Sequence, residues 1–170
     1  MKITLLKGDI TKVTVDGIVN AANTSLLGGG GVDGAIHRAG GKAILDDCMA
    51  IRNRQGGCKV GEAVITGAGN LSAKKVIHTV GPRWNNNQSE EPQKLKNCYL
   101  NVLKLAEENQ LSSLAIPNIS TGIYRFPKHK AAQIAIKTIQ AHQGSSLQEV
   151  IFVCYDDENY QLYQGLLEAK

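Results

Sequence analysis

The sequence lacks any long hydrophobic run, and it has no pronounced excess of one charge. No apolar stretch approaches the roughly 20 residues that a helix needs to cross a bilayer. The apolar stretch at the N-terminus is also too short for a signal peptide. We therefore predict a cytoplasmic protein without membrane partners. The net charge of +4 suits an anionic small molecule, and nucleic acid is not expected because basic residues form no block interleaved with aromatics.

The sequence also lacks the cysteine patterns that bind metals. Its four cysteines are scattered, with no CxxC pair and no His/Cys cluster, at positions Cys48, Cys58, Cys98 and Cys154. In a reducing compartment such cysteines are most simply buried thiols. We therefore predict neither a disulfide framework nor a metal site.

The 170 residues do contain an alternation of short apolar runs and helical patterns, which fits a single domain spanning residues 1–170. The predicted strands are residues 3–7, 17–21, 62–66, 75–79, 113–117 and 150–155. The predicted helices are residues 34–54, 92–109, 127–143 and 158–169. Most strand candidates are apolar throughout, as in strands covered on both faces. This predicts a three-layer α/β/α sandwich with a mixed, largely parallel central sheet, and ligands at the carboxyl ends of its strands.

Four consecutive glycines at positions 28–31 separate a predicted strand from a predicted helix. Without Cβ atoms, their backbone N–H groups can crowd around an anion, and the helix N-terminus behind them adds positive partial charge. The GxxxxGK[ST] motif is absent, and no acidic residue ends a suitably placed second strand, so a nucleotide triphosphatase or a NAD dehydrogenase loses support. The run predicts a phosphate-binding loop that cradles a pyrophosphate.

Five side chains near this loop allow structural or functional interpretations. Asp33 is either a helix N-cap or a base whose pKa a nearby anion raises, and the two roles are compatible. Asn20 is predicted to satisfy loose backbone groups where the strand enters the loop. Asn23 is predicted to hydrogen-bond ribose hydroxyls. His37 and His78 stand in no serine or cysteine nucleophile motif, so we predict that both are structural.

Polar residues follow other predicted strands as well. Residues 120–124 form a second glycine turn, which is either an anion clamp or an ordinary turn into the next helix. Within it, Tyr124 is either a lid over the sugar or a packed aromatic. Asp9 is either a turn aspartate or an acceptor for the exocyclic amine of adenine. Tyr155 either stacks on a base or packs in the core.

Several stretches together resemble the macrodomain family, in particular its MacroD-type (YmdB-like) branch of O-acetyl-ADP-ribose deacetylases. The matching stretches are residues 8–11, 19–23, 28–38, 77–82, 117–127 and 152–159, so the similarity covers essentially the whole chain. The resemblance implies the macrodomain fold, ADP-ribose as the ligand, and neither a metal nor another cofactor. It implies hydrolysis of O-acetyl-ADP-ribose, removal of mono-ADP-ribose from acidic side chains of proteins, or both.

The resemblance also implies roles for individual residues. Asn23 and Asp33 match the catalytic asparagine and aspartate of the family, with Asp33 orienting or deprotonating a water. The residues implied to bind the ligand are Asp9, Ile10, Asn23, Gly30, Gly31, Val32, Ser120, Thr121, Gly122, Ile123, Tyr124 and Tyr155. The alternatives are an ADP-ribose reader without turnover, a phosphatase acting on ADP-ribose 1″-phosphate, and a regulator that binds nucleic acid or protein.

One residue departs from the family pattern. Arg125 stands where many relatives carry glycine. It removes backbone freedom from the second loop and adds a cation near the expected diphosphate. The sequence leaves two consequences open, namely stronger attraction of anions or a restriction on bulky protein substrates.

Overall fold

The computed structural model describes residues 1–85 and 90–168, and its strands form a mixed sheet in the order β1-β6-β5-β2-β4-β3. β3 pairs antiparallel with β4, and the other four pairings are parallel. The predicted mixed, largely parallel sheet is therefore confirmed. The strands are β1 (Lys2–Lys7), β2 (Gly17–Ala21), β3 (Ala63–Gly67), β4 (Lys75–Thr79), β5 (Ser113–Ile116) and β6 (Glu149–Cys154).

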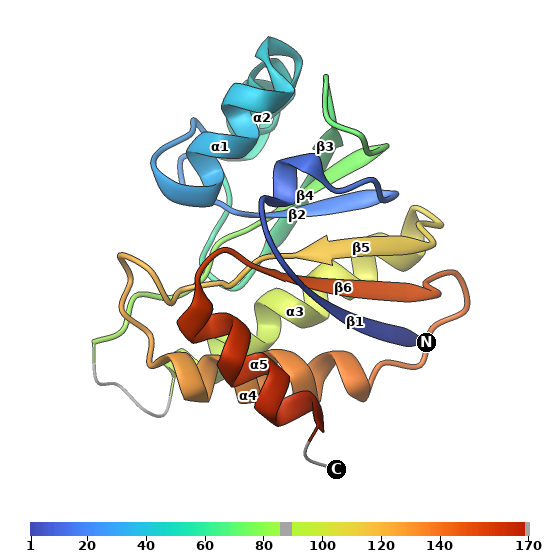
Figure 1. Cartoon of the computed structure of the whole chain (residues 1–170). Helices are drawn as coiled ribbons and strands as arrows, with labels where there is room; N and C mark the ends of the chain where they lie inside the picture. Colours follow the sequence, from blue (N-terminus) through green and yellow to red (C-terminus); the bar gives the residue numbers. More distant parts are fainter. Residues whose placement is uncertain (86–89, 169–170) are drawn as a thin grey trace.

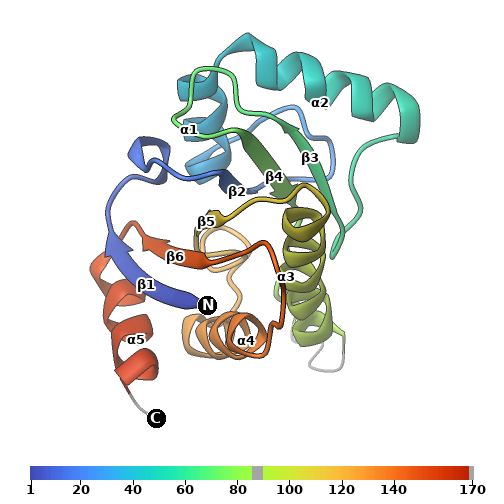
Figure 2. The ribbon, with the colours of Figure 1, turned by 90° about the vertical axis from the view of Figure 1, so that its right-hand side faces the viewer.

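Helices cover both faces of the sheet (Figures 1 and 2), which confirms the three-layer sandwich. One face carries α1 (Gly31–Gly40) and α2 (Lys42–Gln55), and the other carries α3 (Glu91–Glu108), α4 (Lys128–Gln140) and α5 (Asp157–Glu168). A short 3₁₀ turn, η1 (Ile10–Lys12), follows β1 and was not predicted. The last residue of the predicted helix 158–169 lies outside the described residues. None of the described helices is long and apolar enough to span a membrane.

The prediction of one continuous helix over residues 34–54 is wrong, because α1 and α2 are separate helices joined at Gly41. Gly41 has a φ of 85°, which ends α1 and is readily adopted only by glycine. Gly40 also permits close packing at this joint, since a Cβ there would lie 2.0 Å from Ile44 Cδ1. The break leaves α1 as a short helix whose N-terminus lies at the glycine run.

Alternating residues of the central strands pack into two cores, one on each face of the sheet. Leu114 and Ile116 of β5 belong to the core under α3, α4 and α5, whereas Ala115 belongs to the core under α1 and α2. This alternation explains why the strand is apolar throughout. The four cysteines are free and buried, as predicted, and burial raises the pKa of the Cys48 thiol to about 11.

The parallel strands bring their carboxyl ends to one edge of the sheet. The glycine run follows β2, the turn at residues 120–124 follows β5, and Tyr155 follows β6. β1 leads to Asp9 at the same edge. The predicted polar clusters therefore meet where α/β sheets bind their ligands.

Candidate active site

The glycine run ends directly on the first turn of α1. Gly30 is the N-cap residue, and no side chain caps this end of the helix, which begins at Gly31. Gly28 and Gly31 have φ angles of 95° and 57°, which residues with side chains adopt only at a cost. The first N–H groups of a helix have no acceptor within the helix, so this end of α1 is suited to an anion.

Asp33 lies in the first turn of α1 but does not cap it, so the N-cap interpretation is wrong. The residue is 5% exposed, and its Oδ1 accepts a hydrogen bond from Asn20 Nδ2 at 2.8 Å. Its Oδ2 is buried and has no hydrogen-bond partner among the described residues. Burial raises the pKa of Asp33, while the bond from Asn20 and the nearby His37 oppose that rise. A buried carboxylate with one unpaired oxygen is suited to accept a proton.

Asn20 braces Asp33 instead of the backbone, so its predicted role is wrong. It is fully buried in β2, and its Nδ2 lies 2.8 Å from Asp33 Oδ1 and 3.0 Å from His78 Nδ1. The sequence could not reveal this pairing, because it depends on β4 lying beside β2 with His78 opposite Asn20. Asn20 therefore connects the carboxylate to the interior of the sheet.

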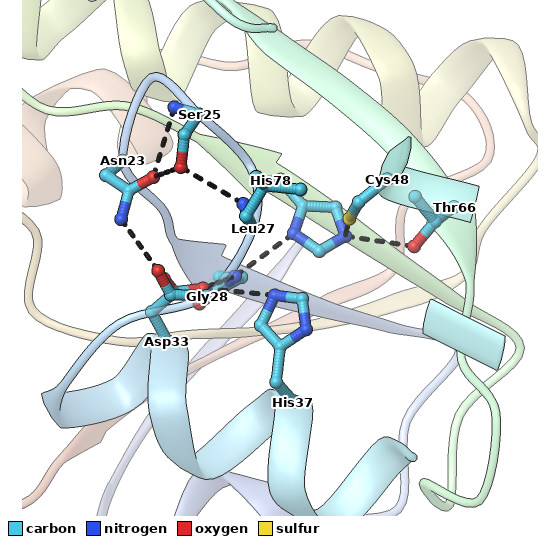
Figure 3. A network of polar contacts seen from close by, with 10 residues as sticks. Asn23, Ser25, Leu27, Gly28, Asp33, His37, Cys48, Thr66 and His78 are labelled. Atoms are coloured by element: carbon cyan, nitrogen blue, oxygen red, sulfur yellow. Dashed lines mark hydrogen bonds and ion pairs between the residues drawn. The ribbon is translucent and has the colours of Figure 1, made fainter. Parts of the chain in front are cut away.

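Asn23 occupies the loop-bracing position that the sequence suggested for Asn20. Its Nδ2 donates to the Gly28 carbonyl at 2.9 Å, and its Oδ1 accepts from the backbone N–H and the hydroxyl of Ser25 (Figure 3). A Cβ at Gly29 would lie 3.3 Å from Asn23 Nδ2 and 3.4 Å from Asp33 Oδ2. Asn23 and Asp33 thus flank the same backbone position in the glycine run.

His37, for which the sequence predicted only a structural role, lies beside Asp33. Its Nε2 is 3.4 Å from Asp33 Oδ1, and its side chain is mostly buried (Figure 3). The available signal was the spacing of four residues, which places both side chains on one side of a helix. A histidine at this position favours the ionised form of the carboxylate whenever the imidazole is protonated.

The second loop combines a strained, buried serine with an exposed tip. Ser120 has a φ of 68°, and its buried Oγ has no hydrogen-bond partner among the described residues. The loop is closed by a hydrogen bond from the Phe126 N–H to the Ser120 carbonyl at 2.8 Å. Thr121 is buried, whereas Gly122 is exposed and Ile123 is 91% exposed. The tip therefore presents backbone and an apolar side chain to the solvent.

A cavity of about 520 Å³ lies between the two loops. Asn23 and Thr24 line it from the first loop, and Tyr124 lines it from the second. The half-buried Tyr124 ring carries the Arg83 guanidinium 5.1 Å from its centroid, so the tyrosine is not simply a core aromatic. Each loop therefore contributes to the cavity wall, but the glycine run at residues 28–31 and residues 120–123 do not line it.

Arg125 adopts a conformation that favours glycine, with a φ of 62°. We expect Arg125→Gly to raise the free energy of unfolding by up to about 1 kcal/mol, because it relieves left-handed strain at an exposed position. Denaturant unfolding of both proteins measures the change. A stability equal to or lower than that of the parent would show that side-chain contacts of Arg125 outweigh the strain.

Comparisons with known proteins identify the family of this chain. The model of the Macro domain family matches residues 19–135. The chain belongs to this family. The macro domain is 59% identical to O-acetyl-ADP-ribose deacetylase 1 of Pantoea vagans, over 98% of both chains. It is 54% identical to the O-acetyl-ADP-ribose deacetylase of Escherichia coli K12, over 98% of this chain and 95% of that protein.

Solved structures show the same fold. An Oceanobacillus iheyensis macrodomain with ADP superposes with a TM-score of 0.91 at 45% identity, covering 96% of this chain and 88% of that one. A Trypanosoma brucei macrodomain in complex with ADP-ribose gives a TM-score of 0.87 at 39% identity, covering 97% and 68%. The resemblance inferred from the sequence motifs is therefore confirmed at the level of family and fold.

The residues expected to contact adenine in this macro domain differ in their exposure to solvent. Asp9 makes the contacts of a turn aspartate through one oxygen: its Oδ1 accepts from the backbone N–H and the hydroxyl of Thr11, and these bonds lower the pKa of Asp9. Ile10 is buried, whereas Tyr155 is 74% exposed. The interpretation of Tyr155 as a residue packed in the core is therefore wrong.

Among residues 1–85 and 90–168, no three His, Cys, Asp or Glu side chains are grouped to hold a metal ion.

Proposed function

We propose that this macro domain binds ADP-ribose and hydrolyses O-acetyl-ADP-ribose. The observation that carries the proposal is the buried Asp33 carboxylate, whose unpaired Oδ2 lies beside Asn23 and the glycine run. The deacetylases of Pantoea vagans and Escherichia coli support it through their names and their full-length similarity. The Trypanosoma brucei macrodomain supports the choice of ligand.

The proposed ligand lies along the edge formed by the two loops. Its diphosphate is held by the N–H groups at Gly30, Gly31 and Val32, where no side chain caps α1. Cβ atoms added at Gly30 and Gly122 would meet no protein atom within 4 Å, so both loops leave room for a close ligand. The other proposed contacts are Asp9, Ile10 and Tyr155 for adenine, and Ser120, Thr121, Gly122, Ile123 and Tyr124 for the diphosphate and distal ribose.

The proposed chemistry is water attack on the acetyl ester. Asp33 Oδ2 accepts a proton from a water, and the water oxygen adds to the acetyl carbonyl carbon. The bond between that carbon and the ribose oxygen then breaks, and Asp33 returns the proton to the ribose oxygen. The products are ADP-ribose and acetate. Asn23 orients the ribose hydroxyls, which requires its Nδ2 to exchange the Gly28 carbonyl for the ligand. Because Oδ2 is buried, a water reaches it only when the glycine run shifts, which glycine backbone permits.

We also propose that the same site removes mono-ADP-ribose from acidic side chains of cytoplasmic proteins. The observation that favours this second substrate is the cavity between the loops. Most of its lining lies outside the residues proposed for ADP-ribose and includes Val60, Arg83 and Lys94. That surface has room for a group much larger than an acetyl ester.

The purified chain tests both proposals in one set of assays. With O-acetyl-ADP-ribose, we expect acetate and ADP-ribose to appear in equal amounts, as measured by chromatography. With a protein carrying mono-ADP-ribose on glutamate, we expect free ADP-ribose and the unmodified side chain. Binding of ADP-ribose without turnover of either substrate would identify a reader module. Release of inorganic phosphate from ADP-ribose 1″-phosphate alone would identify a phosphatase.

A further inference from the structure

His78 lies inside the sheet, away from the proposed ligand contacts. It is fully buried in β4, and the register of β2 and β4 places it opposite Asn20. Its ring approaches three polar partners on the α1–α2 side of the sheet. Asn20 lies at Nδ1. Thr66 of β3 and Cys48 of α2, which Figure 3 labels, lie at Nε2.

The hydrogen bonds of Thr66 determine which nitrogen of His78 donates and which accepts. The Thr66 hydroxyl is 2.8 Å from the Gly67 carbonyl, which can only accept, so the hydroxyl hydrogen points there. Thr66 Oγ1 is therefore the acceptor for the N–H at His78 Nε2, at 2.9 Å. In neutral imidazole the other nitrogen then carries a lone pair. His78 Nδ1 accepts from Asn20 Nδ2 at 3.0 Å.

This direction determines which end of the Asn20 amide faces Asp33. Nδ2 has two hydrogens, and it donates one to His78 Nδ1 and the other to Asp33 Oδ1. A flipped amide would bring its oxygen against the carboxylate and against the imidazole lone pair at once. The observed orientation engages Oδ1 of Asp33 and leaves Oδ2 without a partner.

We propose that His78 is a positioning residue, which acts through Asn20 to hold Asp33 with Oδ2 free for the attacking water. Thr66 is the last member of this hydrogen-bond chain, and it holds His78 in the tautomer that accepts at Nδ1. The inference rests on the proposed role of Asp33. It assigns a purpose to a histidine that the sequence suggested was merely structural.

This hydrogen-bond chain requires a neutral imidazole, and the surroundings of His78 keep the imidazole neutral. Burial, with a smaller contribution from the nearby His37 of α1, lowers the pKa of His78 to about 3. The titratable groups around the ring are His37, with ring centroids 6.2 Å apart, Cys48 of α2, and Asp33 beyond Asn20. His78 therefore works as an acceptor at physiological pH without itself exchanging protons.

Two matched pairs of variants separate positioning from packing. His78→Asn places a side-chain oxygen near the Nδ1 position, where it can accept from Asn20, whereas His78→Gln places its polar group near Nε2 and loses that acceptor. Thr66→Val removes the hydroxyl at constant shape, and Thr66→Ser keeps it. We expect kcat for O-acetyl-ADP-ribose to fall about 10²-fold in His78→Gln and less than tenfold in His78→Asn. ADP-ribose affinity should change less than twofold in all four variants.

The pH profile supplies a readout that packing alone would not move. Loss of the bond from Asn20 raises the pKa of Asp33, so the acid limb of kcat/KM should shift to higher pH in His78→Gln and Thr66→Val. It should stay near the parent in His78→Asn and Thr66→Ser. Equal losses in both His78 variants, or an unmoved acid limb in Thr66→Val, would overturn the inference.

Failure of the proposed function can be distinguished from failure of the positioning inference. If the parent protein hydrolyses no substrate, the catalytic proposal fails by itself. The carboxyl ¹³C shift of Asp33 then reports its titration directly by NMR, without turnover. A raised Asp33 pKa in Thr66→Val but not in Thr66→Ser would still support the positioning inference, and identical titrations would overturn it.

Discussion

Asp33→Ala is expected to lower the turnover of O-acetyl-ADP-ribose by about 10²–10⁴-fold while ADP-ribose still binds, because a general base contributes about that much to rate. Calorimetry of ADP-ribose binding and chromatography of acetate release measure the two effects separately. If affinity fell in proportion to turnover, Asp33 would support the architecture of the loop and would not be the base.

The pH dependence of turnover follows from the burial of Asp33. The base works only when ionised, so activity falls as the pH drops through its pKa. Burial raises that pKa above the value of 3.8 for an ordinary aspartate, and the acid limb should therefore lie at higher pH than for an exposed carboxylate. An acid limb at or below pH 3.8 would contradict the assignment of Asp33 as the base.

Asp33→Asn provides the matched control for folding. A carboxyl group whose pKa is raised in the folded state contributes stability below its unfolded pKa, and that contribution is lost as the pH rises through its folded pKa. Asparagine cannot ionise, so at neutral pH the variant should unfold at the same temperature as the parent or higher. Lost turnover in a protein of undiminished stability separates chemistry from folding.

The sequence predicted the fold well, because its signals were local. The continuous apolar runs of the strands and the stripes of α3 and α4 reflect burial that each segment shows by itself. The failure at residues 34–54 was local too. The Gly40–Gly41 pair marked the break, but the surrounding helix-forming residues hid it.

The site was only partly predictable, because its geometry depends on contacts between distant segments. The glycine run, Asn23 and Asp33 were identified as a group from their order in the chain. The contacts of Asn20 were predicted wrongly, because the register of β2 and β4 brings His78 to Asn20 across 58 positions. No periodicity or motif encodes such a register by itself.

Gly34→Ala is expected to lower the free energy of unfolding by roughly 1–3 kcal/mol, although alanine is the better helix former. Gly34 is buried in α1, and a Cβ there would lie 2.4 Å from the Gly29 carbonyl oxygen. The new methyl group must push the glycine run away from the helix. Gly29 separates Asn23 from Asp33, so turnover should fall together with stability.

Gly165→Ala is the matched control, since Gly165 is also helical but exposed in α5, with no atom within 4 Å of an added Cβ. This change should raise the free energy of unfolding by about 0.5–1 kcal/mol and leave turnover unaltered. Denaturant unfolding and acetate release compare the two variants directly. If both substitutions stabilised the protein alike, the glycine run would not be pressed against α1. Contact with α1 would then not be what holds the backbone of Gly29 between Asn23 and Asp33.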